Sequence, residues 1–181
     1  MQEILFANAE AKVLRFLCDH LDQSFYEREI ADQAGVSSSA VNLAARTLYE
    51  HGLLLREERG RMNFYAADDR HPVVRQFKVL GTVADLEPIL NSLRPLAQRL
   101  ILFGSAAEGT DTAESDIDLF ILAADRRQVL DALRRSEMGA RIQPVIVNSQ
   151  ELVELKEAEP AFYRQIQCGV HLWEMSDERA A

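Results

Sequence analysis

Apolar residues in the N-terminal part of the chain recur at the spacing of short amphipathic helices. Val13, Phe16 and Leu17 follow this spacing within residues 9–20, which predicts a first helix. Farther along, Gly35 suits the positive φ that often ends a helix, and a serine of the run that follows can cap the next helix. We expect these two helices at about Glu27–Ala34 and Ser38–His51, with Gly52 ending the second.

The second of these helices has an inner and an outer face, and a hairpin follows it. Its apolar positions are Val41, Ala44 and Leu48, and the residues left pointing outward include Ser39, Asn42 and Arg46. The next stretch, "LLLREERGRMNFYAAD", holds strand-like runs on either side of Arg59 and Gly60, which indicates a β-hairpin. The predicted order is therefore helix, helix, turn, helix and hairpin.

Helical and strand-like patterns alternate in the rest of the chain. Residues 79–98 have helical periodicity, with Pro88 expected in a first turn and Pro95 expected to kink or end the helix. The strand-like runs are "LILF" at 100–103, "IDLFILA" at 117–123, "IQPVIVN" at 142–148 and a short last run, "VHLWEM". Helical segments separate them, and a break is expected near Pro160. This alternation predicts an α/β unit.

Composition changes this picture little. Hydrophobic residues make up 48% of the chain and charged residues 27%, as in a globular protein. The N-terminus lacks the pattern of a signal peptide, and no stretch has the length of a membrane span, so we expect a cytoplasmic protein without a membrane partner. Cys18 and Cys168 lie far apart with no cysteine or histidine cluster around them, so we expect buried, reduced thiols.

The distribution of charge bears on nucleic-acid binding. The formal net charge is -9, which disfavours a phosphate-binding surface across the whole protein. However, residues 1–78 carry 10 Lys and Arg against 12 Asp and Glu, while the rest carries 10 against 17. The acidity therefore belongs mainly to the C-terminal half.

One segment, "FGSAAEGTDTAESDIDLF" at residues 103–120, has the pattern of a phosphate and metal site. Gly104 and Ser105 end one predicted strand and open a helical turn, where a close backbone approach and free N–H groups favour an anion. Asp116 and Asp118 stand at alternate positions of the next strand, so their side chains leave the same face. Two carboxylates at this spacing repel each other, and a magnesium ion shared with substrate phosphates removes the conflict.

The N-terminal pattern, over roughly residues 8–70, resembles the winged helix-turn-helix regulators of bacteria and archaea. By this resemblance the second helix of the motif would enter the major groove of DNA, and the hairpin would contact the backbone. The residues that it assigns to double-stranded DNA are Ser38, Ser39, Asn42, Arg46, Arg56, Arg59 and Arg61. The alternative is that this module packs only against a protein partner.

The Gly-Ser and Asp-x-Asp motif resembles that of polymerase β-type nucleotidyltransferases, and is most similar to the minimal nucleotidyltransferases of prokaryotes. The resemblance implies that Gly104 and Ser105 hold the triphosphate of a nucleoside triphosphate. It likewise implies that Asp116 and Asp118 are catalytic and bind magnesium. We therefore expect an α+β chain of two domains, an N-terminal winged helix-turn-helix and a C-terminal nucleotidyltransferase α/β domain with a mixed sheet. The expected bounds are 1–75 for the first domain, 76–98 for a connecting helical segment and 99–181 for the second domain.

This chain departs from the family pattern at two positions. Active members usually carry a third carboxylate on the following strand, but no acid lies between Gly139 and Gln150, and Gln143 occupies the corresponding position. An amide cannot accept a proton, and loss of a general base typically lowers a rate by roughly 10²- to 10⁴-fold. The second departure is Glu108, where many relatives carry a basic residue.

The sequence leaves three functions open. The favoured interpretation is a DNA-binding transcriptional regulator, expected to be a homodimer, with a magnesium-dependent nucleotide-binding domain whose turnover is undecided. The first alternative is an active nucleotidyltransferase that moves a nucleoside monophosphate to a hydroxyl of a protein or small molecule. The second is an antitoxin-like protein that modifies or neutralises a partner. Fold analogy alone does not choose among them.

Overall fold

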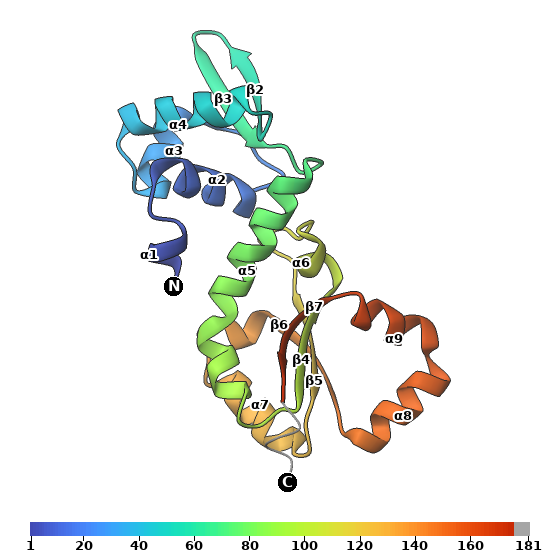
Figure 1. Ribbon diagram of the computed structural model, residues 1–181. Coiled ribbons are helices and arrows are strands. Elements are labelled where there is room, and N and C mark those ends of the chain that lie inside the picture. Colours follow the sequence, from blue (N-terminus) through green and yellow to red (C-terminus); the bar gives the residue numbers. More distant parts are fainter. Residues whose placement is uncertain (176–181) are drawn as a thin grey trace. The chain divides into compact units, whose positions relative to one another are not determined.

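The computed structural model describes residues 1–175, and the chain divides there into two compact units (Figure 1). The first unit comprises Met1–Ala84 with Thr112–Glu114. The second comprises Asp85–Asp111 with the described residues from Ser115 onward. The division falls inside helix α5 (Pro72–Leu93), so each unit contains one part of this helix.

Two helices of the first unit begin at capping side chains. The Asn8 side chain accepts a hydrogen bond from the Ala11 N–H at 2.8 Å, and Ser37 accepts one from the Ala40 N–H at 3.4 Å. Gly35 has a φ of 64° and ends α3, as its position in the sequence predicts. The helices are α1 (Gln2–Leu5), α2 (Ala9–Asp19), α3 (Glu27–Ala34) and α4 (Ser38–Glu50). The predicted helices α2, α3 and α4 are thus confirmed to within one residue.

An antiparallel sheet with strand order β1-β3-β2 completes this unit. Its strands are β1 (Phe25–Tyr26), β2 (Leu54–Arg59) and β3 (Met62–Ala67). Strands β2 and β3 form the predicted hairpin, with Arg59 opposite Met62 at its tip. The short strand β1, which the sequence pattern did not predict, pairs Phe25 with Tyr65.

The core of the first unit lies between these helices and the sheet. The side chains of this core are at most 9% exposed, and they come from every element except α1 and the hairpin tip. Fully or almost fully buried examples are Val13, Leu17, Ile30, Val41, Ala45, Leu54 and Tyr65. Burial of a single Val, Leu or Ile side chain stabilises a fold by about 1.5–3 kcal/mol. The core therefore fixes the outward direction of the opposite face of α4.

Helix α5 corrects one prediction from the sequence. It spans Pro72–Leu93 rather than residues 79–98, and Pro72 is its first residue. Pro88 therefore lies in the interior of the helix and not in a first turn. Proline lacks an N–H, so the Ala84 carbonyl loses its helical donor at this point. Among residues 1–175, no helix is long and apolar enough to cross a membrane.

The second unit is built on a mixed sheet with strand order β6-β5-β4-β7. Its strands are β4 (Arg99–Phe103), β5 (Ile117–Leu122), β6 (Ile142–Val147) and β7 (Val170–Glu174). Strand β4 pairs antiparallel with β5 and β7, whereas β5 and β6 are parallel. This confirms the expected mixed sheet and each of the strand-like runs.

Helices cover both faces of this sheet. Figure 1 shows α7 on one side and α8 and α9 on the other. Phe120 and Leu122 of β5 pack in one cluster with Leu152 of α8 and Ile166 of α9. The elements between the strands are α6 (Gly104–Glu108), α7 (Arg126–Arg134), a 3-10 turn (Glu137–Arg141), α8 (Ser149–Ala158) and α9 (Pro160–Gln167).

The cysteines differ in burial. Cys18 is buried in the first unit, and this burial raises the pKa of its thiol to about 12. Cys168 is exposed at the end of α9, so the expectation of burial was wrong for this residue. Both residues lie near a helix end, but Cys18 belongs to the core cluster of the first unit, whereas Cys168 is the residue that follows α9.

Candidate functional site

Two aspartates lie at the start of β5, and the second of them, Asp118, is on the face that α8 and α9 cover. Asp116 precedes the strand and is exposed, while Asp118 is its second residue and is half-buried. Side chains alternate along a strand, so Asp118 shares its face with Phe120, which packs among α8 and α9. The carboxylates therefore stand at the edge of an apolar cluster, which limits the access of water to Asp118.

Gly104 brings the preceding turn directly against Asp118. Strand β4 ends opposite β5, with Phe103 as the register partner of Asp118. Gly104 follows with a φ of 69°, a backbone conformation that favours glycine. A Cβ at this position would lie 2.2 Å from Asp118 Oδ2. A side chain here would displace the Asp118 carboxylate, and Ser105 follows in the first turn of α6.

Gln143 is the neighbour of Asp118 on the next strand. In the parallel ladder of β5 and β6 their Cα atoms are register partners, and neighbouring strands lie about 4.8 Å apart. Partners in a ladder share a face, so the neutral amide of Gln143 stands beside the carboxylate. Gln143, which stands in the sequence where active family members usually carry a third carboxylate, is thus the neighbour of Asp118 on β6.

Arg141 places a positive charge at the same end of the sheet. It ends the 3-10 turn before β6, and its Nη2 donates a hydrogen bond to the Ser115 carbonyl at 3.4 Å. Ser115 immediately precedes Asp116 in the chain. No local sequence signal marks Arg141 as a site residue, because only the parallel register of β5 and β6 brings it to this end.

The electrostatics of the pair suit a cation. Burial, and then the neighbouring Asp116 carboxylate, raise the pKa of the Asp118 carboxyl above its ordinary value. A divalent ion relieves both effects, and carboxylate oxygens are ligands that magnesium prefers. The described residues contain no group of three or more His, Cys, Asp or Glu side chains placed to hold a metal ion. The donor set fits a magnesium ion that takes its remaining ligands from water and substrate.

Comparison with known proteins decides the family. Residues 86–178, just over half of the chain, match the family model described as polymerase beta, nucleotidyltransferase. This chain belongs to the polymerase β nucleotidyltransferase family. The matched segment contains the Gly104–Asp118 contact and strands β4 to β7, so the family assignment and the mixed sheet concern the same unit.

A curated relative names one activity found among similar proteins. The chain is 35% identical over 80 residues to the protein adenylyltransferase MntA of Shewanella oneidensis. The alignment covers 44% of this chain and 55% of that protein, so the chain spans about half the length of the curated relative. No solved structure matches the chain.

The residues assigned to DNA by the sequence lie on the exposed surface of the first unit, but several contact residues of their own unit. Asn42 donates to Glu27 at 2.8 Å, and Arg46 pairs with Glu50 at 2.8 Å. Arg59 at the hairpin tip pairs with Glu57 at 2.6 Å. Ser38 and Ser39 lie exposed in the first turn of α4, and Arg61 is exposed in the hairpin turn. Neighbouring acids thus offset part of the positive charge of this face.

Aromatic rings hold two of these arginines. The guanidinium of Arg56 lies 4.5 Å from the ring centroid of Tyr49, and that of Arg59 lies 4.5 Å from the centroid of Phe64. Such cation–π contacts contribute about 0.5–1 kcal/mol at exposed sites. They fix the two side chains against the hairpin and α4.

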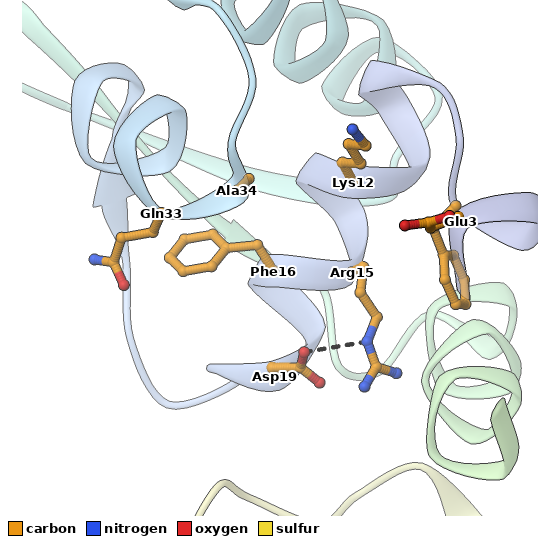
Figure 2. A pocket seen from close by; sticks show the side chains of 8 residues that line it. Glu3, Lys12, Arg15, Phe16, Asp19, Gln33 and Ala34 are labelled. Atoms are coloured by element: carbon orange, nitrogen blue, oxygen red, sulfur yellow. Dashed lines mark ion pairs between the residues drawn. The ribbon is translucent and has the colours of Figure 1, made fainter. Parts of the chain in front are cut away.

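The first unit also has a pocket of about 330 Å³ beside α2 (Figure 2). Figure 2 shows Arg15 pointing toward Asp19, with an ion pair of 3.1 Å between Arg15 Nε and Asp19 Oδ2. The Arg15 guanidinium lies over the Phe6 ring and packs so tightly on Gly81 that a Cβ there would lie 1.3 Å from Nη1. We interpret this arginine as a packing element between α2 and the first part of α5.

Proposed function

We propose that the second unit is a magnesium-dependent nucleotidyltransferase that transfers a nucleoside monophosphate from a nucleoside triphosphate to a protein. The observation that carries this proposal is the contact between Gly104 and Asp118, where a Cβ would lie 2.2 Å from the carboxylate. A triphosphate that approaches the Gly104 backbone is therefore adjacent to the carboxylates that bind its metal. Membership of the nucleotidyltransferase family supports the same chemistry.

Each proposed site residue has a separate role. Asp116 and Asp118 hold magnesium, which supplies neutralisation of the charge on the reacting phosphates. Gly104 allows the phosphates to approach the backbone, and the Ser105 hydroxyl donates a hydrogen bond to them. The packing of β5 against α8 and α9 holds Asp118 in place before substrate binds, so little reorganisation is needed.

The name of the relative favours ATP as donor and a protein as acceptor. That relative is a protein adenylyltransferase, and its similarity to this chain extends over 80 residues. An active transferase is thus better supported than the DNA-binding regulator that the sequence analysis favoured.

Calorimetric titration of ATP with and without magnesium tests the proposal. We expect binding that requires magnesium, followed by incorporation of label from α-labelled ATP into protein. Loss of the Asp116 or Asp118 carboxylate should abolish this binding. Asp131→Asn is the matched control, because it removes one carboxylate from α7, the helix that follows the other end of β5. The absence of magnesium-dependent nucleotide binding at millimolar ATP would overturn the proposal.

As a second candidate function, we propose that the first unit is a winged helix-turn-helix that binds double-stranded DNA, with the chain acting as a homodimer. The observation that favours it is the strand order β1-β3-β2 behind α3 and α4, with the outer face of α4 exposed. Two acidic partners, Glu27 and Glu50, lie on or beside that face and weaken its attraction for phosphate. Binding to DNA fragments over a series of salt concentrations tests this role, and size-exclusion chromatography with light scattering tests the homodimer.

A further inference from the structure

The ladder position beside Asp118, where the family pattern places a proton acceptor, holds no base in this chain. If Asp116 and Asp118 are occupied by a metal, their lone pairs are engaged. The ladder neighbour of Asp118 is Gln143, whose amide does not accept a proton at neutral pH. Across the described part of the chain, no third His, Cys, Asp or Glu joins the pair in a metal-binding group.

An acceptor that is already ionised needs no base. A serine or threonine hydroxyl must lose a proton to attack phosphorus, and the missing base costs roughly 10²- to 10⁴-fold in rate. A phosphate monoester has a second pKa of about 6, so its oxygens carry nearly two negative charges at neutral pH. Its attack requires no proton transfer.

Such an acceptor brings negative charge toward a triphosphate, and Arg141 places a positive charge at the same end of the sheet. The Arg141 guanidinium lies at the start of β6, tied to the carbonyl of the residue before Asp116. Gln143 next to Asp118 adds no further negative charge, whereas a carboxylate there would repel an anionic acceptor. An arginine also offers planar donors that match phosphate oxygens.

We propose, on the basis of the function proposed above, that the acceptor is a phosphate monoester on a protein side chain, with Arg141 as the acceptor-binding residue. In the reaction an acceptor phosphate oxygen forms a bond to the α-phosphorus of ATP. The bond from that phosphorus to the α–β bridging oxygen breaks, and pyrophosphate leaves with the electron pair. The product is a phosphoanhydride between adenylate and the acceptor phosphate, and no proton is exchanged.

Inorganic phosphate is the simplest probe of this chemistry. Attack of labelled phosphate on the α-phosphorus of ATP gives ADP labelled at its β position, a product that ATP hydrolysis does not form. We compare phosphate with glycerol and acetate at equal concentration, with ATP and magnesium present. We expect phosphate to react at least about tenfold faster than either. A glycerol hydroxyl must lose a proton, and without a base to accept it the rate falls by at least the low end of the general-base effect.

A phosphoserine peptide, its serine counterpart and a 5′-phosphorylated oligonucleotide identify the source of the phosphate. We expect adenylate on the phosphoserine peptide and on neither of the others. Preference for the oligonucleotide would overturn a protein acceptor.

Variants of Arg141 separate acceptor binding from stability. Arg141→Gln should raise the KM for phosphate about tenfold, with less than about a twofold change in the calorimetric affinity for magnesium ATP. Arg141→Lys should retain part of the effect, and Arg127→Gln, which removes an exposed charge from α7, is the matched control. A parallel loss of ATP affinity and melting temperature would show that Arg141 is only structural.

The outcomes distinguish this inference from the function on which it rests. Transfer to glycerol or to the serine peptide, but not to phosphate, overturns the inference and leaves the nucleotidyltransferase in place. Transfer to acetate in preference to phosphate has the same effect. Magnesium-dependent ATP binding without transfer to any of these probes also overturns the inference. No magnesium-dependent ATP binding overturns the proposed function itself.

Discussion

The candidate nucleotide site of the second unit lies on adjacent strands. The candidate DNA-binding surface of the first unit lies instead on one face of a helix and on a hairpin. The ladder of β4, β5 and β6 fixes Phe103, Asp118 and Gln143 side by side. On the first unit the candidate residues are exposed, and Asn42 and Arg46 have acidic partners of their own. The register of a sheet determines which side chains are neighbours. An exposed helix face does not determine which molecule binds to it.

The two units also differ in how their charges are arranged. The second unit brings like charges together, and the pKa of Asp118 is raised by burial and by Asp116. In the first unit opposite charges are already paired, as in Arg59 with Glu57. Repulsion between two neighbouring carboxylates is the pattern expected of a cation-binding site. Salt bridges such as that of Arg59 with Glu57 are as common on surfaces without a binding function as on binding surfaces.

The largest effect that we predict comes from removing the carboxylate pair. Asp116→Asn with Asp118→Asn should lower nucleotidyl transfer by about 10³-fold or more, because no charged ligand remains for the metal. Transfer of label from ATP measures this, with circular dichroism to show that the fold is retained. Undiminished transfer would mean that the chemistry occurs elsewhere in the chain.

Gln143→Glu should change the acceptor that the site uses. A carboxylate beside Asp118 provides a proton acceptor, so we expect transfer to glycerol to rise about 10- to 100-fold, within the range of general-base effects. Tighter magnesium binding in the presence of a non-hydrolysable ATP analogue is a second readout. Unchanged values for both would contradict the role assigned to this ladder position.

Gly104→Ala should weaken binding of magnesium ATP by about tenfold, since the new Cβ displaces the Asp118 carboxylate. Gly60→Ala is a matched control, because its φ of 68° is nearly equal but no atom lies within 4 Å of its Cβ position. Calorimetry measures both. Equal effects from the two variants would mean that backbone strain, rather than contact with Asp118, is responsible.

On the first unit we predict a smaller, salt-dependent effect. If the hairpin contacts DNA, Arg59→Ala with Arg61→Ala should lower affinity severalfold near 0.1 M salt and reduce the salt slope by about 2. Arg70→Ala, an exposed arginine outside the hairpin strands, is the control. Fluorescence anisotropy over a salt series measures this. Insensitivity of all variants to salt would favour a protein-binding surface.

The smallest predicted effect is on stability. Because the pKa of Asp118 is raised in the folded chain, its ionisation above that pKa opposes folding, and the cost disappears as pH falls below the ordinary value. Asp118→Asn should therefore raise the melting temperature of the metal-free protein by about 1–3 °C at pH 7 and have little effect near pH 3. Differential scanning calorimetry checks this, and a decrease at pH 7 would show that the carboxylate makes a stabilising contact.

Local patterns in the sequence were enough for most elements. Periodicity and capping residues predicted α2 to α4, the hairpin and strands β4 to β7, because these features depend on neighbours within a few positions. Alternation along a strand also predicted that Asp116 and Asp118 share one face, although β5 begins at Ile117, after Asp116. The sequence pattern was wrong about α5, where packing of the helix tolerates Pro88 in its interior.

Tertiary structure alone decided how the site is assembled. The contact of Gly104 with Asp118, the pairing of Asp118 with Gln143 and the approach of Arg141 to Ser115 join segments separated by 14 to 26 residues. Strand order and register set these contacts, and both depend on how the apolar faces of β4, β5 and β6 are buried together. A single sequence records the residue types that can form such a site, but burial of the whole sheet selects which of them become neighbours.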